Sequence, residues 1–133
     1  MANKKAILRR LSLDLIGLPA PTSLREKFLQ KDEPITYETL VDSLLISPQF
    51  GEKWASKWLD LARYADSKGF ERDPNRSIFP YRDYVIKSFN ANKPYDQFVT
   101  EQLAGDELVE PPYKNMTDDA IEKLAATGFL RMA

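Results

Sequence analysis

Apolar residues recur at intervals of three and four through almost every segment of this 133-residue chain, and prolines and glycines separate those segments. The clearest segment runs from Pro48 to Ala65. One helical face of it carries Phe50, Trp54, Trp58 and Leu61. No segment alternates apolar and polar residues as a half-buried strand does. The spacing therefore predicts an all-α fold, a single compact domain of about six to eight short helices.

Capping residues predict where several helices begin and end. Thr36 and Thr117 each precede an apolar segment and can accept a hydrogen bond from a free backbone amide. Ser23, followed three residues later by Glu26, resembles a capping box that opens a short helix. Gly105 lies where a helix is expected to end. Because the helices are short and prolines fill the connections, we expect them to pack orthogonally rather than as a long bundle.

The helical pattern stops between Asp66 and Phe79, which predicts one long charged loop. Connections of this length inside a compact domain are often functional. We expect residues 1–133 to form a single helical domain. Basic residues precede the apolar stretch 11–20, but Asp14 and Pro19 interrupt it, so we predict neither a signal peptide nor membrane insertion.

The chain contains neither histidine nor cysteine. These absences exclude imidazole bases, His-ligated metals, thiolate nucleophiles and covalent haem attachment in this chain, so we expect no metal and no cofactor. Any chemistry would use carboxylates, arginine, lysine and tyrosine. With 19 basic and 20 acidic residues, the charge is balanced, and nucleic acid is not an expected partner.

The main candidate for a ligand-binding site is a set of charged residues on both sides of the long loop. Its members are Asp60, Arg63, Asp66, Arg82 and Asp83. Arginines can hold an anionic or polyhydroxylated ligand, such as a saccharide, while one carboxylate acts as acid or base. The alternative is structural, because Arg–Asp pairs commonly connect helix ends. No catalytic residue is assigned by this pattern.

A second set of polar residues lies on, or just past, the helix expected after Pro94. Its members are Asp96, Glu101, Gln102 and Asp106. Two carboxylates could support acid–base catalysis of the glycosidase type if they faced each other across a cleft. The alternative for Asp96 is a helix start, where a carboxylate complements the free amides and the helix dipole.

Several long strings of the sequence resemble one protein family. They are RRLSLDLIGLP from Arg9, WLDLARYADSKGFERD from Trp58, YRDYVIKSFN from Tyr81, KPYDQFVTEQLAGDEL from Lys93 and ATGFLR from Ala126. Their order and spacing are similar throughout the chain to the planctomycete cytochrome-associated domain of unknown function. All nine candidate residues lie in these strings, and the resemblance assigns none of them a role.

The resemblance implies an exported bacterial protein of several domains, in which this domain follows a c-type cytochrome module. It therefore implies that residues 1–133 are a fragment of a longer multidomain protein. It implies a periplasmic or extracellular location, neighbouring domains of the parent protein as partners, and haem only in a separate domain. Two functions follow as expectations. The first is an accessory or binding module of such a protein, and the alternative is a carbohydrate-active or related hydrolytic enzyme that uses the carboxylate and arginine cluster.

Overall fold

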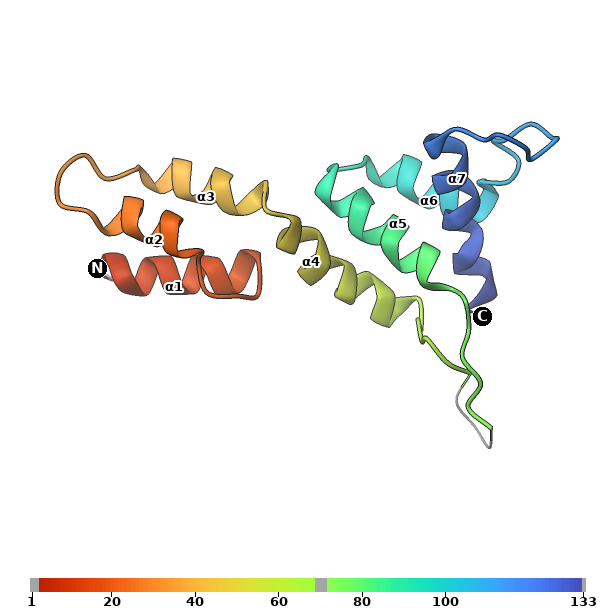
Figure 1. Ribbon diagram of the computed structural model, residues 1–133, viewed down its shortest axis with the longest axis horizontal. Helices are drawn as coiled ribbons and strands as arrows, with labels where there is room; N and C mark the ends of the chain where they lie inside the picture. Colours follow the sequence, from red (N-terminus) through yellow and green to blue (C-terminus); the bar gives the residue numbers. More distant parts are fainter. Residues whose placement is uncertain (1–2, 69–71, 133) are drawn as a thin grey trace. The chain divides into compact units, whose positions relative to one another are not determined.

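The computed structural model of the protein describes residues 3–68 and 72–132 (Figure 1). These residues form α1 (Lys4–Leu15), α2 (Thr22–Leu29), α3 (Tyr37–Leu45), α4 (Pro48–Leu61), α5 (Phe79–Asn90), α6 (Tyr95–Ala104), α7 (Asp118–Ala126) and the 3₁₀ helix η1 (Thr127–Arg131). Within this described part there is no β-strand, and a single bridge joins Ser67 to Asn75. The predicted all-helical class, with short helices and one long charged connection, is confirmed.

Backbone contacts group the chain into two compact units, residues 1–54 and residues 55–133. The boundary falls inside α4, between Trp54 and Ala55. Each unit has its own cluster of buried apolar side chains. That residues 1–133 act as one domain, and as part of a longer protein, stays a prediction.

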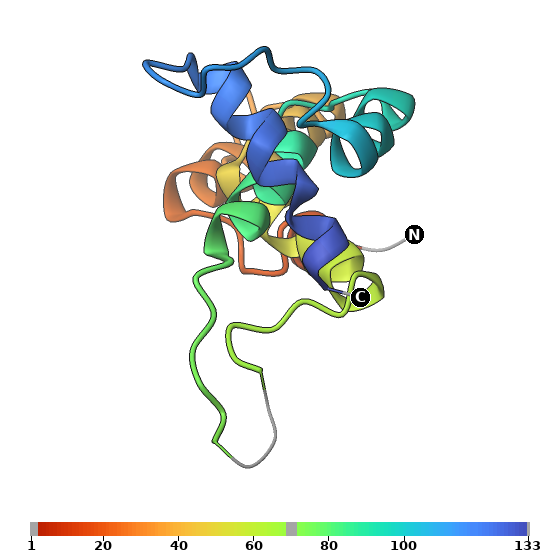
Figure 2. The same cartoon turned by 90° about the vertical axis from the view of Figure 1, so that its right-hand side faces the viewer.

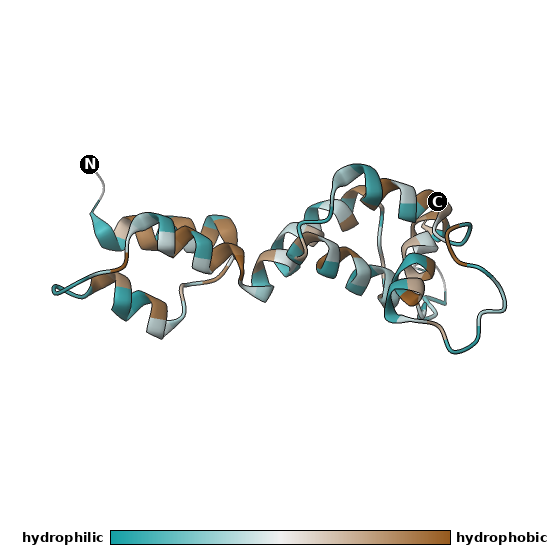
Figure 3. Cartoon of the chain, turned by 90° about the horizontal axis from the view of Figure 1, so that it is seen from above, coloured by the Kyte–Doolittle hydropathy of each residue, from teal (hydrophilic) through white to brown (hydrophobic). Residues whose placement is uncertain are grey.

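The first unit is held together by apolar faces of its short helices. α1 contacts both α2 and α3. The buried cluster consists of Leu8, Ile16, Phe28, Leu40 and Leu44. Each of these helices carries both hydrophobic and hydrophilic residues, as an amphipathic helix does (Figure 3). The buried hydroxyl of Ser12 donates to the carbonyl of Leu8, which removes the cost of an unpaired polar group in this cluster.

The second unit packs α5, α6, α7 and η1 around the end of α4. Its buried cluster includes Tyr81, Tyr84, Val85, Phe98 and Ala126. α7 contacts α5 and α6, and η1 contacts α6 (Figure 2). The site candidates of the sequence all belong to this unit, so its packing decides which of them meet.

Two of the three N-cap predictions are confirmed, and Gly105 is the C-cap of α6 as expected. Thr36 and Thr117 are N-caps whose side chains accept from the amides of Thr39 and Ala120. The capping box at Ser23 is wrong. α2 begins at Thr22, and Pro21 occupies the N-cap without a side-chain hydrogen bond. Because proline fixes φ near the required value and its carbonyl accepts from Arg25, the hydrogen-bond ladder starts two residues before Ser23.

The connection between α4 and α5 is closed at its base. The Arg76 amide donates to the Asp66 carbonyl, and the Lys68 amide donates to the Pro74 carbonyl, at 2.7 Å and 3.1 Å. The Arg76 guanidinium also donates to the carbonyl of Arg131 in η1. Figure 2 shows this connection leading away from the helices of the second unit and returning.

Among the described residues, no helix is long and apolar enough to span a bilayer.

Candidate functional site

The end of α4 explains the backbone role of Arg63. This residue has a positive φ of 55°, and its amide donates to the carbonyl of Asp60. The next amide, of Tyr64, donates to the carbonyl of Leu59 at 2.9 Å. These two bonds form a Schellman motif in which Arg63 takes the left-handed position usually given to glycine. Arg63 therefore stops the helix and turns the chain into the long connection.

A surface cluster at the start of this connection joins part of the predicted set. The Tyr64 hydroxyl donates to Asp66 Oδ1 at 2.5 Å. Arg82 Nη1 lies 4.0 Å from the same carboxylate, and Arg82 Nε and Nη2 both donate to Asp83 Oδ1 at 3.2 Å. The side chains of Arg82 and Asp66 are 39% and 69% exposed, so water screens this cluster.

The remaining two members of the main set lie outside this cluster. Asp60 and Arg63 are exposed, and no side-chain ion pair is recorded for either within the described part of the chain. The structure thus brings together Asp66, Arg82 and Asp83 with the neighbouring Tyr64. Whether these residues bind a ligand stays a prediction.

Burial and the neighbouring carboxylate alter the chemistry of Tyr64. Desolvation, and then the hydrogen bond to Asp66, raise the pKa of the Tyr64 phenol to about 12. The phenol is therefore protonated at neutral pH and acts as a hydrogen-bond donor. It stabilises the start of the loop and is unsuited to act as a base.

Replacing Arg63 with glycine tests whether this residue is a structural or a binding residue. We expect the Arg63→Gly variant to gain about 0.5–1 kcal/mol in the free energy of unfolding, because glycine adopts a positive φ without strain. Urea unfolding followed by circular dichroism measures this gain. A loss of stability would instead mean that the guanidinium makes a stabilising contact. Thermal stability of both proteins with saccharides and polyanions would show whether the guanidinium binds a ligand.

The second candidate set is divided between surface and core. Asp96 lies exposed in the first turn of α6, where a carboxylate favours the helix start, and Asp106 lies exposed just past that helix. Glu101 and Gln102 are each 1% exposed. Asp96 and Asp106 are therefore surface carboxylates, while Glu101 belongs to the core.

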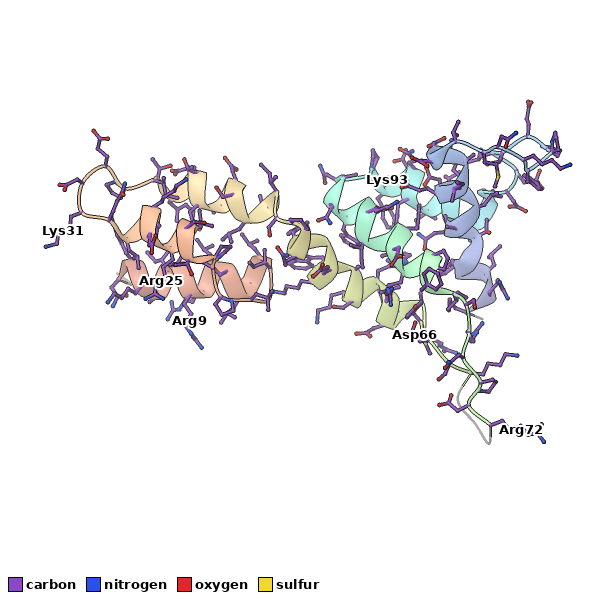
Figure 4. All side chains as sticks on the ribbon, viewed as in Figure 1. Arg9, Arg25, Lys31, Asp66, Arg72 and Lys93 are labelled. Carbon is purple, nitrogen blue, oxygen red and sulfur yellow. The ribbon has the colours of Figure 1, made fainter. Side chains whose placement is uncertain are left out.

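Glu101 is enclosed by groups that satisfy its charge. Lys93 Nζ donates to its Oε2 at 2.5 Å, Gln97 Nε2 donates to Oε1 at 2.8 Å, and the Tyr84 hydroxyl donates to Oε2 at 2.9 Å. The Lys93 ammonium also lies 4.7 Å from the centre of the Tyr84 ring. Figure 4 shows Lys93 well away from Asp66, so the Lys93–Glu101 pair is separate from the surface cluster.

Local structure places Lys93 in this core. Asn92 has a positive φ of 47°, and the amides of Asn92 and Lys93 donate to the carbonyls of Phe89 and Ser88. This is a second Schellman motif, and it ends α5. Lys93 follows directly, one residue before the N-cap Pro94 of α6.

Burial and hydrogen bonding act in opposite directions on Glu101. Desolvation works to raise the pKa of the Glu101 carboxyl, but the hydrogen bonds from Lys93, Gln97 and Tyr84 outweigh it and lower that pKa below its ordinary value. Desolvation and the hydrogen bond to Glu101 raise the pKa of the Tyr84 hydroxyl. At neutral pH this group is therefore an ionised carboxylate held by an ammonium and a phenol, with no proton to give.

Gln102 organises the adjacent part of the core. Its Oε1 accepts from Trp58 Nε1 at 2.9 Å and from the Tyr81 hydroxyl at 2.7 Å, and its Nε2 donates to the Phe98 carbonyl at 3.0 Å. Burial raises the pKa of the Tyr81 phenol to about 12. Within the described residues, no buried side-chain polar atom lacks a hydrogen-bond partner. Both networks are thus complete without a ligand.

The sequence pattern did not assign these partners, although one signal for them exists. Glu101 and Gln102 follow Phe98 by three and four residues, which is the spacing of the buried face of α6. A carboxylate at such a position needs a cation from a neighbouring element. Lys93 is the cation, and only the turn at Asn92 brings it there.

An open hollow of about 360 Å³ lies between the segment after α6 and the start of α7. Its walls include Leu108, Glu110, Lys114, Asp119 and Lys123. Lys123 is paired with Asp119 at 2.6 Å. Because its charges have both signs and it contains no predicted site residue, the hollow favours no particular ligand.

The described residues hold no group of three or more Asp or Glu side chains suited to a metal ion.

Comparison with known proteins identifies the chain at the level of a family. The model of the family PSCyt2, described as a protein of unknown function (DUF1549), matches residues 1–133. Neither a search of curated proteins nor a search of solved structures found a match. The match confirms the resemblance to the planctomycete cytochrome-associated domain of unknown function. The chain belongs to the PSCyt2 family of proteins of unknown function.

Proposed function

We propose that this chain is an accessory module of an exported, cytochrome-linked multidomain protein, and that it acts by contacting neighbouring domains of that protein. Family membership supports the starting point of this proposal, which is that the chain is a domain of the PSCyt2 family. The observation that carries the rest is the exposure of large apolar side chains on the helices of the second unit. Leu61 is 79% exposed, Tyr95 70% and Leu103 53%. We infer that these side chains contribute to a surface that contacts another domain, since exposed apolar surface marks protein–protein contact when it is contiguous.

The polar residues support a binding module better than a hydrolytic enzyme. Glu101 is a buried carboxylate of the second unit: its side chain is 2% exposed and already accepts hydrogen bonds from Lys93, Gln97 and Tyr84, so a substrate does not reach it. The surface carboxylates Asp66 and Asp83 are exposed and paired with Arg82. An acid–base pair needs at least one desolvated carboxyl group facing a cleft, and this arrangement supplies none.

Hydrogen exchange tests the docking proposal. Exchange rates would be measured by mass spectrometry for the isolated chain and for the same residues inside the intact parent protein. We expect exchange in helices that carry exposed apolar side chains to slow by at least about tenfold in the parent, because docking covers them. Equal rates throughout the chain in both proteins would contradict the proposal.

A cofactor-free chain is part of this proposal. We expect the purified chain to show no haem absorption band, with haem confined to a separate domain of the parent. The absorption spectrum between roughly 400 and 600 nm, taken after incubation with haem under reducing conditions, checks this expectation. A stoichiometric band from the chain alone would contradict it.

A further inference from the structure

We propose that the outer face of α6 binds a cationic amphipathic helix of a neighbouring domain, an inference that rests on the proposed function and names the partner. The outer face is defined by Tyr95, Val99 and Leu103, which lie four residues apart and so line one side of the helix. The buried side of α6, next to this face, carries Phe98, Glu101 and Gln102. The outer face is thus apolar, and more than half of Tyr95 and of Leu103 remains exposed on it.

Tyr95 and Leu103 give this face the character of an anchor. Their side chains are 70% and 53% exposed, at opposite ends of about two helical turns. The Tyr95 ring lies edge-on to Trp58, with 6.4 Å between ring centres. Trp58 is itself fixed by hydrogen bonds to Tyr81 and Gln102, so the Tyr95 ring has an ordered neighbour on one side. A pre-ordered aromatic side chain loses little entropy on binding.

The charges around the outer face select the chemistry of the partner. The stretch 94–113 contains five acidic residues and no lysine or arginine. Glu101 is buried and paired with Lys93, which leaves Asp96, Asp106, Glu107 and Glu110 exposed. Consecutive turns from Ala104 to Val109 keep the acidic residues 106 and 107 next to the end of α6. A partner with lysines or arginines beside its apolar stripe complements this rim, whereas an anionic membrane would be repelled.

A helix fits the outer face better than an extended strand does. The three apolar residues repeat at four-residue spacing over roughly 12 Å, which matches the stripe of an amphipathic helix laid alongside. α6 offers no free sheet edge to pair with a strand. The occupant is therefore a helix with leucine-type residues on one side and basic residues next to them.

The test uses the synthetic amidated peptide LKKLLKLLKKLLKL, whose leucines and lysines occupy opposite sides of a helix. Binding to the isotope-labelled chain is followed by NMR and calorimetry at low salt. We expect saturable binding with shift changes concentrated in residues 95–110. Tyr95→Ser combined with Asp96→Asn should weaken the affinity by about tenfold, because an anchor and a rim charge are lost together. Leu103→Ser, at the other end of the face, should weaken it independently.

A matched control lies on α3. Tyr37 is 50% exposed and is followed by exposed Glu38, at the same two starting positions of its helix as Tyr95 and Asp96. Tyr37→Ser combined with Glu38→Gln should leave the affinity unchanged. Equal weakening by both pairs, no binding at all, or equally tight binding of a peptide with glutamates in place of lysines would overturn the inference.

The outcome for the peptide is separable from the outcome for the proposed function. If the peptide fails to bind α6 while hydrogen exchange shows another face protected in the parent protein, only the present inference is rejected. If exchange shows no protected face, the proposed function is rejected as well.

Discussion

Replacing Gly105 with alanine is expected to destabilise the second unit by about 3 kcal/mol. Gly105 is buried at the end of α6, with ordinary helical backbone angles. A Cβ at this position would overlap the backbone carbonyl groups of Lys123 and Glu101. Neither carbonyl can rotate away as a side chain could, so α6 and α7 must separate to admit a methyl group. Urea unfolding followed by circular dichroism measures the change.

The control for this prediction is Thr100→Ala on the same helix. Thr100 is exposed, and its hydroxyl donates to the carbonyl of Asp96 one turn earlier. Its removal should change the free energy of unfolding by less than about 0.5 kcal/mol. If Gly105→Ala were as stable as Thr100→Ala, α6 and α7 could not approach as closely as described.

Replacing Lys93 with methionine should have an effect of similar size, about 3–5 kcal/mol, for an electrostatic reason. The Glu101 side chain is 2% exposed and that of Lys93 is 14% exposed. Methionine keeps the length of the apolar stem but leaves a carboxylate in the core without its cation. Tyr84 and Gln97 still donate hydrogen bonds to Glu101, yet they carry no charge.

The stability of the wild type and that of the Lys93→Met variant should change with pH in opposite directions. In the wild type, the pKa of Glu101 is lowered by folding, so its contribution to stability is present above the ordinary glutamate pKa and is lost as the pH falls through the folded value. In Lys93→Met, burial without the cation should raise that pKa. The folded variant then binds a proton more tightly than the unfolded chain, and acidification from pH 7 should stabilise it. Urea unfolding at several pH values measures both slopes.

The double variant Lys93→Met with Glu101→Leu separates charge from packing. Removing both charges should restore most of the lost stability, since an apolar pair can replace a buried ion pair at little cost. A double variant no more stable than Lys93→Met would show that packing around Lys93, and not its charge, is what the core requires.

The helices could be predicted from the sequence because they depend on local spacing and on capping residues. Thr36 and Thr117 cap their helices as expected, since an N-cap needs only a hydroxyl near the next amides. The failure at Ser23 has the same local character, because Pro21 provides a competing start two residues earlier. The family could also be predicted, since the motifs of the sequence are long and ordered.

The candidate site was less predictable, because a charged residue carries no mark of its burial. Asp66 and Arg82 meet only because the long connection closes at its base and returns the chain to α5. The sequence did not indicate that the backbone of Arg63 forms a helix end, and its predicted role in ligand binding stays a prediction. Glu101 resembles a surface glutamate in the sequence, and its partner Lys93 lies eight residues away across a turn whose direction is set by one positive φ.

The turn at Asn92 has a consequence for how this part of the family can vary. The same backbone conformation that ends α5 also directs the Lys93 ammonium to Glu101, so the length of this link is set by the core and not by the surface. A single inserted residue between Asn92 and Pro94 would move the ammonium out of reach while both helices stayed intact. Insertions should therefore be tolerated far less in this exposed link than its place at the surface suggests.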